Sequence, residues 1–302
     1  ASDAGSIGHG GARWFEGARL NFAENLLRRR DEETAIVAWD ERGRQASLSF
    51  AELYRQTARL ADALRQRGVG QGTRVAAFMP NVSETVVAML ATSALGATFS
   101  SCSPDFGVAG VVDRFGQIEP TVLIAADGYR YAGKAFDLTE RIEGILHGVP
   151  SIQYTIVVPH LHERPGVEYF RGGLLWNDLL AHGPDETEFA QLPFDHPLYI
   201  LYSSGTTGVP KCIVHGQGGT LLQHQKEHVL HTDLRPGERL FYFTTCGWMM
   251  WNWLVTALAA EATIVLYDGS PFYPDPSILW RMADEEGLHV FGTSAKYISA
   301  LE

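Results

Sequence analysis

The chain has 302 residues, of which 45% are hydrophobic and 20% charged, the composition of a globular protein with a sizeable core. Its formal net charge of −11 argues against nucleic acid or an anionic membrane surface as a partner. Three widely spaced cysteines argue against a disulfide framework and favour a cytoplasmic location, and no apolar run reaches the roughly 20 residues of a membrane span.

Helical and strand patterns alternate along the chain. A capping-box pattern, Ser49 followed by Glu52, begins the first long helix, and we expect Asn81 or Ser83 to cap the next one. Up to residue 125 the predicted elements are a short helix at 23–27, a strand hairpin at 34–39 and 46–50, a helix from 49, a strand at 74–79, a helix at 82–95, a strand at 97–100, a helix at 104–118 and a strand at 121–125. A helix at 136–146, a strand at 153–158, a helix at 174–180 and strands at 198–202 and 212–214 follow. The last predicted elements are a helix at 219–231, a strand at 239–244, a helix at 251–259, a strand at 263–267, a helix at 276–286, a strand at 289–291 and a helix from 294.

This alternation predicts an α/β fold with doubly wound, mostly parallel sheets. We expect an N-terminal segment at 1–30 and a first α/β subdomain at 31–195. The phosphate loop described below and the start of a second, incomplete α/β subdomain are expected at 196–302. Residues 159–197 are expected to form a looser surface connection.

A loop rich in hydroxyls and glycine lies between two short apolar runs that are predicted strands. Small residues let backbone N–H groups approach an anion closely, hydroxyls add donors, and a lysine adds a positive charge. A plain flexible linker is the alternative, but the strands on both sides fit it poorly. The pattern predicts a phosphate-binding loop made of Ser203, Ser204, Gly205, Thr206, Thr207, Gly208 and Lys211.

Three other motifs do not match this region. A Walker A motif needs lysine directly after its second glycine, but Val209 and Pro210 intervene here. A G-x-S-x-G elbow would need glycine at Leu201 or Tyr202. A dinucleotide fingerprint begun by the glycines after the second strand fails because its third glycine would fall on Leu221.

The run Tyr202 to Lys211 resembles the signature loop of the adenylate-forming superfamily, which includes acyl-CoA synthetases, peptide-synthetase adenylation domains and firefly-luciferase-like enzymes. In that family the loop holds the β- and γ-phosphates of ATP and moves as pyrophosphate leaves. The resemblance implies catalytic roles for Thr206 and Lys211. Val209 stands where relatives often carry lysine, which removes one charge and leaves the core of the motif.

Nearly the whole chain takes part in the resemblance. Residues 14–26 and 266–275 resemble acyl-CoA synthetases for short acids, and residues 244–253 are most similar to the branch that activates acetoacetate. The resemblance implies an AMP-forming acid–thiol ligase that takes acetoacetate, ATP and CoA, with Mg²⁺, through acetoacetyl-AMP. Another short acid, such as acetate or propionate, is the alternative substrate.

In this family several parts of the site lie beyond the position equivalent to Glu302: an acidic residue near Mg²⁺, an aspartate on the ribose, a hinge, and a lysine on a small C-terminal domain. We therefore expect an adenylate-forming N-terminal domain that is truncated before the barrel and the C-terminal domain. These 302 residues alone are not expected to form acetoacetyl-CoA. A nucleotide-binding fragment without turnover is a further alternative.

Tryptophan and methionine cluster directly after the predicted strand at 239–244. Ligands of open α/β sheets bind beyond the carboxyl ends of strands, and these side chains form dry, adaptable walls. In acetyl-CoA synthetases the residues that contact the acyl group follow the matching Gly-Trp. We predict an acyl pocket of Trp248, Met249, Met250 and Asn252. The alternative is that these side chains belong to the hydrophobic core. For Trp251 and Trp253 a core position is at least as well supported as a position in the pocket.

A zinc hydrolase is a distant alternative. His224 and His228 match the H-x-x-E-H pattern, and histidines four residues apart share a helix face. The motif is short and arises by chance, so we expect these histidines to pack along a partly exposed helix face, and no metal site is predicted.

Three smaller features complete the expectations. Thr245 stands where acetyl-CoA synthetases carry an acidic residue. The segment 292–294 matches a family segment that lines the nucleotide and acyl site, with a simple helix cap by Thr293 or Ser294 as the alternative. Cys102 and Cys246 are expected to be small buried residues.

Overall fold

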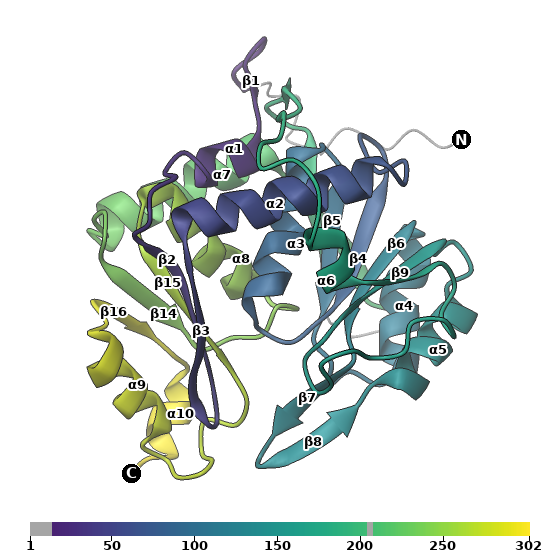
Figure 1. Ribbon diagram of the computed structural model, residues 1–302. Coiled ribbons are helices and arrows are strands. Elements are labelled where there is room, and N and C mark those ends of the chain that lie inside the picture. Colours follow the sequence, from purple (N-terminus) through teal and green to yellow (C-terminus); the bar gives the residue numbers. More distant parts are fainter. Residues whose placement is uncertain (1–13, 204–207) are drawn as a thin grey trace.

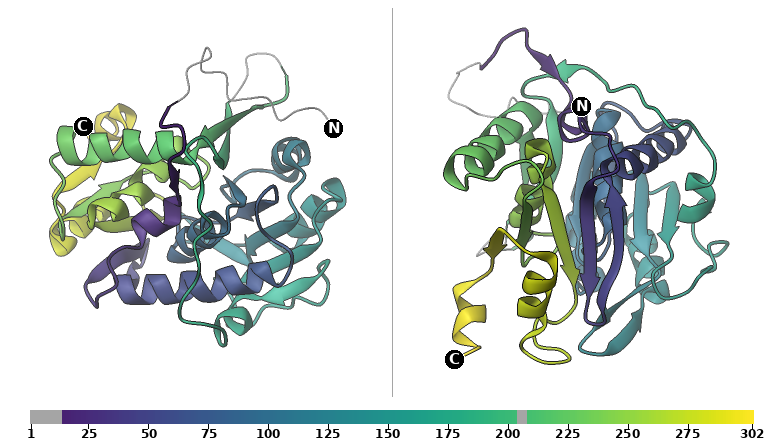
Figure 2. Two further views of the ribbon diagram at one scale, coloured as in Figure 1. Left: turned by 90° about the horizontal axis from the view of Figure 1, so that it is seen from above. Right: turned by 60° about the vertical axis from the view of Figure 1, so that its left-hand side comes forward.

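The computed structural model describes residues 14–203 and 208–302 (Figure 1). Within these residues a seven-stranded sheet and a five-stranded sheet enclose a layer of helices, and further helices cover both outer faces (Figures 1 and 2). The layers therefore alternate as helix, sheet, helix, sheet, helix. This confirms the predicted doubly wound α/β fold.

The seven-stranded sheet is parallel except at one edge, where β13 runs antiparallel to β12. Helices α4 (Val108–Ile118) and α5 (Thr139–Gly148) cover its outer face. In spatial order its strands are β10 (Gly173–Leu175), β9 (Tyr154–Val158), β6 (Val122–Ala126), β4 (Arg74–Phe78), β5 (Thr98–Cys102), β12 (Pro197–Ser203) and β13 (Lys211–Gly216).

The five-stranded sheet is parallel except for the hairpin of its last two strands. Helices α9 (Ile278–Glu286) and α10 (Ala295–Ser299) lie on its outer face. In spatial order its strands are β16 (Val290–Gly292), β14 (Arg239–Tyr242), β15 (Thr263–Asp268), β2 (Thr34–Asp40) and β3 (Gly43–Ser49).

The central layer contains α1 (Phe22–Leu26), α2 (Phe50–Arg65), α3 (Ser83–Ala94) and α8 (Met249–Thr256). Helix α3 is buried on all sides, which fits a sequence without a polar face. Alternate strand residues serve different layers: Val75 and Ala77 of β4 face the central helices, whereas Ala76 and Phe78 pack toward α4 and α5. This period of two fixes which side of each sheet meets which helices.

Each of the two sheets contains strands from both sides of position 195/196. The β2–β3 hairpin precedes that position and belongs to the five-stranded sheet, whereas β12 and β13 follow it and belong to the seven-stranded sheet. The helical elements not yet named are α6, α7 and a 3₁₀ turn. Helix α6 spans Trp176–Leu180, and α7 (Gln217–Gln225) continues as a π-helix over Lys226–His231. The 3₁₀ turn, Ala257–Ala260, follows α8. No helix of the described residues is long and apolar enough to cross a membrane.

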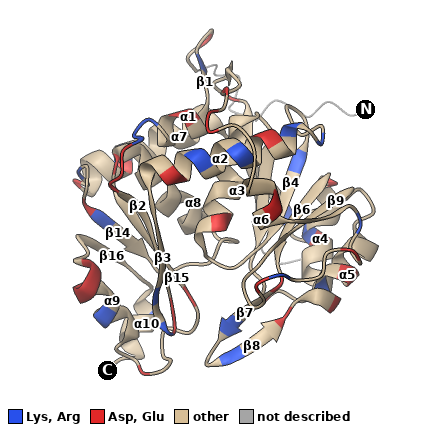
Figure 3. Cartoon of the chain, viewed as in Figure 1, with Lys and Arg blue, Asp and Glu red and all other residues tan. Residues whose placement is uncertain are grey.

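Two expectations about local structure were wrong. The predicted helix at 136–146 begins only at Thr139, because Phe136 belongs to a hairpin of β7 (Gly128–Tyr131) and β8 (Lys134–Asp137) and stacks on Tyr129 with ring centroids 4.9 Å apart. This hairpin carries an arginine on β7 and a lysine on β8 (Figure 3). The connection at 159–197 is more ordered than expected, since it also contains β10 and a short strand, β11 (Leu192–Pro193), that pairs with β1 (Arg19–Leu20).

One of the two capping predictions is confirmed, and the other is wrong. The Ser49 hydroxyl accepts a hydrogen bond from the Glu52 N–H at 3.1 Å, which confirms the cap of α2. Helix α3 instead begins after Val82 without a side-chain cap, so the prediction for Asn81 or Ser83 was wrong. The side chain of Asn81 points to the other sheet, as described below.

Candidate functional site

The carboxyl ends of both sheets meet on one side of the molecule, in the lower part of Figure 1. Asn81, directly after β4, donates through its N–H to Asp268 at the end of β15. Its side-chain amide donates to the carbonyl of Thr244, just beyond β14. Segments that are up to 187 residues apart in sequence are thus joined at one edge, where ligands of α/β sheets bind.

The predicted phosphate loop opens at this edge. Ser203 and Lys211 are the last directly paired residues of β12 and β13, so they stand at the two sides of the loop opening. Gly208 has a φ of +107°, a conformation that favours glycine. The predicted residues Ser204, Gly205, Thr206 and Thr207 lie outside the described residues. The roles of the loop residues therefore stay predictions.

Helix α4 supports the opening from the side. Gln117 donates through Nε2 to the carbonyl of Pro210 at 2.9 Å. The guanidinium of Arg114 lies 5.8 Å from the ring centroid of Tyr202 and so places a second positive charge beside the strand that ends at Ser203. The Ser100 hydroxyl and the Tyr202 phenol lie 2.9 Å apart, and burial raises the phenol pKa well above its usual value, so Tyr202 stays neutral. Sequence reasoning missed both α4 residues, because a helix of mixed polarity gives no motif.

The segment after β14 reaches across to the seven-stranded sheet. The Ser101 hydroxyl of β5 donates to the carbonyl of Cys246 at 2.7 Å, and the Cys246 thiol donates to the carbonyl of Met79 at 2.9 Å. Strand β5 is also the parallel neighbour of β12, which carries the loop opening. The predicted acyl segment and the predicted phosphate loop therefore emerge beside the same strand.

The predicted acyl residues differ in exposure. Trp248 is 64% exposed and Met249 44% exposed, which is unusual for large apolar side chains at a strand end, and Met250 is partly buried. Asn252 is only 1% exposed, and its amide donates to the Trp248 carbonyl at 3.4 Å. Trp251 and Trp253 are buried, so the alternative of a place in the core is confirmed for these two.

Two further hydroxyls lie at this edge. The Thr245 and Thr293 side chains follow the adjacent parallel strands β14 and β16, and their buried hydroxyls have no hydrogen-bond partner among the described residues. Buried hydroxyls are normally paired, so these two are candidate ligand contacts. Ser294, in contrast, accepts a hydrogen bond from the Tyr297 N–H at 3.2 Å, which confirms the simple cap for that residue.

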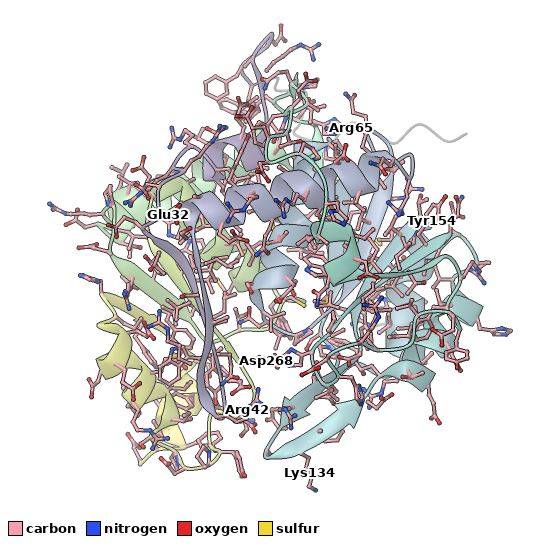
Figure 4. The ribbon with its side chains drawn as sticks, in the orientation of Figure 1. Glu32, Arg42, Arg65, Lys134, Tyr154 and Asp268 are labelled. Carbon is pink, nitrogen blue, oxygen red and sulfur yellow. The ribbon has the colours of Figure 1, made fainter. Side chains whose placement is uncertain are left out.

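Asp268 is an ionisable group inside the site (Figure 4). Desolvation raises the pKa of its carboxyl, the Asn81 N–H lowers it, and the nearby acidic residues Asp40, Glu41 and Asp105 raise it, which together give a pKa of about 7. Cys102 and Cys246 are buried as expected, and burial raises the pKa of both thiols. These cysteines are therefore poor nucleophiles.

His224 and His228 are buried rather than partly exposed as predicted. The Nδ1 atom of His224 lies 2.9 Å from the Thr256 hydroxyl, and the Nε2 atom of His228 lies 2.8 Å from the Trp253 carbonyl oxygen. Burial lowers the pKa of both imidazoles to about 4. Among the described residues no group of three potential ligands surrounds them, so the geometry favours packing over zinc binding.

Two mostly parallel sheets that meet at their carboxyl ends, with the predicted phosphate loop at the opening, define an α/β domain of the kind that binds ligands at this edge. The sequence signature of the AMP-binding enzyme family matches residues 22–301, and the chain belongs to that family.

Several similar proteins are acetoacetyl-CoA synthetases. Over 96% of this chain the sequence is 54% identical to an acetoacetyl-coenzyme A synthetase of Rhizobium meliloti (strain 1021) and 46% identical to the acetoacetyl-CoA synthetase of Rattus norvegicus. The solved structure of acetoacetyl-CoA synthetase from Streptomyces lividans superposes with a TM-score of 0.91 at 48% identity, covering 96% of this chain. These comparisons confirm the resemblance stated from the sequence. The chain spans 44 to 45% of the length of these three relatives.

Proposed function

We propose that the protein carrying this chain is an acid–thiol ligase that converts acetoacetate, ATP and CoA to acetoacetyl-CoA, AMP and pyrophosphate. The proposal is supported by the identity to proteins of that activity over almost the whole chain. The observation that carries it is that the segment with the exposed Trp248 and Met249 is held through Cys246 to β5, the strand that neighbours the loop opening. A cytoplasmic location is part of the proposal and is supported by three cysteines without disulfides.

The chemistry requires an activated carboxyl group. A carboxylate is a poor electrophile, because its charge and resonance oppose attack. Transfer of AMP to it gives acetoacetyl-AMP and releases pyrophosphate, and the CoA thiolate then attacks the acyl carbon and displaces AMP. Negative charge builds on the departing pyrophosphate in the first step, so fixed donors there accelerate the reaction.

The loop residues fit that task. In the proposal the N–H and hydroxyl groups of 203–208 and the ammonium group of Lys211 bind the β- and γ-phosphates. Ser203 and Lys211 already face each other across the opening, and Gln117 holds the closing end of the loop. Mg²⁺ on the phosphates would add charge stabilisation.

The acid is proposed to lie against Trp248, Met249 and Met250. Substituting Met249 or Met250 with valine would shorten one of these side chains and widen the acyl pocket. We therefore expect the ratio of acetoacetate to acetate turnover to change by about tenfold, which is the effect of one or two methylene groups in a pocket. An unchanged ratio in both variants would show that these methionines do not contact the acid.

The test is acid-dependent ATP–pyrophosphate exchange by the full-length protein that carries this sequence. Acetoacetate, acetate and propionate are compared at equal concentration, and acetoacetate is expected to give the highest kcat/KM. A preference for another acid would change the substrate and keep the reaction class. Absence of exchange with every acid would refute the proposed function.

A further inference from the structure

We infer that Asn81 is a positioning residue that fixes the wall formed by Trp248, Met249 and Met250 and thereby sets the choice of acid. The inference rests on the proposed function. Its geometric part, that Asn81 holds the segment 244–251 in place, can be tested without any substrate.

Asn81 forms hydrogen bonds through its backbone N–H and through both ends of its side-chain amide. Its N–H donates to Asp268 Oδ1 at 3.0 Å, and its Nδ2 donates to the carbonyls of Thr244 at 3.3 Å and Tyr267 at 3.2 Å. Its Oδ1 accepts a hydrogen bond from the indole Nε1 of Trp251 at 2.9 Å. The residue is 2% exposed, so these contacts do not compete with bulk water.

Two of the three side-chain contacts hold both ends of one segment. Thr244 begins the segment 244–251 and Trp251 ends it, and a single amide group binds both. The exposed Trp248 and Met249 lie between these two points. Because both ends are bound to one rigid planar group, a shift of Asn81 would move the whole wall.

The amide is chemically required at this position. It must donate to two carbonyls and accept from an indole, and a side chain with only donors or only acceptors cannot do both. Aspartate has the same shape, but its carboxylate would face the carbonyl oxygens of Thr244 and Tyr267 and would add a second acid beside Asp268.

Two further hydrogen bonds hold this segment, and both lie on the N-terminal side of the wall. Ser101 and the Met79 carbonyl hold only Cys246, which precedes the wall. The Trp251 contact lies on the far side of the wall and fixes the first turns of α8. Without Asn81 the segment keeps the contacts of Cys246 and loses the hydrogen bonds to Thr244 and Trp251.

Asn21 offers a matched control. It is also a buried asparagine, its Nδ2 also donates to backbone carbonyls, those of Ser93, Ala94 and Ala190, and its Oδ1 accepts from the Glu24 N–H at 3.2 Å. It lies at the opposite end of α3, and the 12 residues of that helix span about 18 Å. Its loss should therefore destabilise the fold without moving the wall.

The experiment compares Asn81→Ala and Asn21→Ala by hydrogen–deuterium exchange and by pyrophosphate exchange in the full-length protein. In Asn81→Ala we expect faster amide exchange in 244–251 and a fall of about tenfold in the ratio of kcat/KM for acetoacetate over acetate, with the KM for ATP within about twofold of the parent. In Asn21→Ala we expect parent-like exchange in 244–251 and a parent-like ratio.

If Asn81→Ala does not fold, Trp251→Phe replaces it as the test variant, because it removes the indole N–H donor and keeps an aromatic ring. Trp176→Phe is the control for this variant, because it also removes a buried indole. An unchanged ratio and unchanged exchange at 244–251 in the informative variant would overturn the inference. If the parent shows no acid-dependent activity, the proposed function fails, and the hydrogen-exchange comparison still decides whether Asn81 holds the segment.

Discussion

Lys211 carries a positive charge at the opening of the candidate phosphate loop, directly opposite Ser203. Backbone donors can be supplied by any small residue in such a loop, but a full charge cannot. The lysine is therefore the residue whose loss should affect the transition state more than the fold.

We expect Lys211→Ala to lower the kcat of pyrophosphate exchange by about 10²-fold, the effect of removing one donor that faces developing charge. Its melting temperature should stay near that of the parent, because the side chain is exposed. Lys226→Ala, which removes an exposed lysine of the π-helix, is the control and should keep parent activity. Equal activity of Lys211→Ala and the parent would remove this lysine from the mechanism.

Asp268 makes stability depend on pH. Its folded pKa of about 7 lies above the ordinary value of 3.8, so between these values the folded state binds more protons than the unfolded state. The free energy of unfolding therefore falls as pH rises through this window. We expect Asp268→Asn to gain stability relative to the parent between pH 5 and pH 8, measured by urea denaturation. The exposed Asp113→Asn is the control, and a constant difference between Asp268→Asn and the parent would contradict the prediction.

At the scale of elements, the helix that follows the loop changes character along its length. Residues Gln217–Gln225 form the regular α-helix α7. The chain then continues as a π-helix from Lys226 to His231, in which the His228 side chain is buried. The Thr256 hydroxyl donates to the Asn252 carbonyl at 2.7 Å and so accepts from His224, which couples α7 to the helix that carries the predicted acyl wall. The zinc-like spacing of the two histidines thus serves packing.

The same two histidines should weaken the protein in acid. Their folded pKa of about 4 lies below 6.5, so the unfolded state binds more protons in between, and stability is lost as pH falls through that range. We expect His228→Gln to lose less stability than the parent between pH 7 and pH 5 in urea denaturation. His182→Gln, at an exposed position, should behave as the parent. Identical losses in all three proteins would refute this assignment.

At the scale of the whole molecule, a further contact besides those of Asn81 and Cys246 ties the two halves at their carboxyl edge. The Glu41 carboxylate, at the tip of the β2–β3 hairpin, accepts from the N–H groups of Ala132 and Gly133 in the β7–β8 turn and from Ser270 after β15. A side chain at Gly133 would lie 2.5 Å from the Tyr273 ring, so this turn is closely packed as well. One carboxylate therefore joins the seven-stranded half to the five-stranded half.

Glu41→Ala should loosen that connection. Three backbone N–H groups would lose their acceptor; the one of Ser270 is buried, and an unsatisfied buried donor costs about 1 to 3 kcal/mol. We expect a lower melting temperature and faster hydrogen exchange at 128–137, with exchange in α3 unchanged. Glu143→Ala, on the exposed face of α5, is the control, and parent-like exchange at 128–137 in Glu41→Ala would contradict this role.

Much of this architecture was readable in the residues themselves. The order of strands and helices, the α/β class and the cap at Ser49 follow from period, turn residues and local hydrogen bonding, which are properties of neighbouring residues. The hydroxyl- and glycine-rich loop was recognisable for the same reason, since its residues are contiguous. The β7–β8 hairpin was missed, because only its pairing partner distinguishes Phe136 from the first turn of a helix.

The sequence by itself therefore determined the class of fold, the family and the two segments that the proposed function needs. Only the tertiary structure decided which strands share a sheet and that Trp248 and Met249 are exposed while Asn252 is buried. It also decided that Asn81, which looked like a helix cap, holds Thr244 and Trp251 instead. A local cap and a partner 170 residues away compete for the same amide, and packing between the two sheets determines which of them it binds.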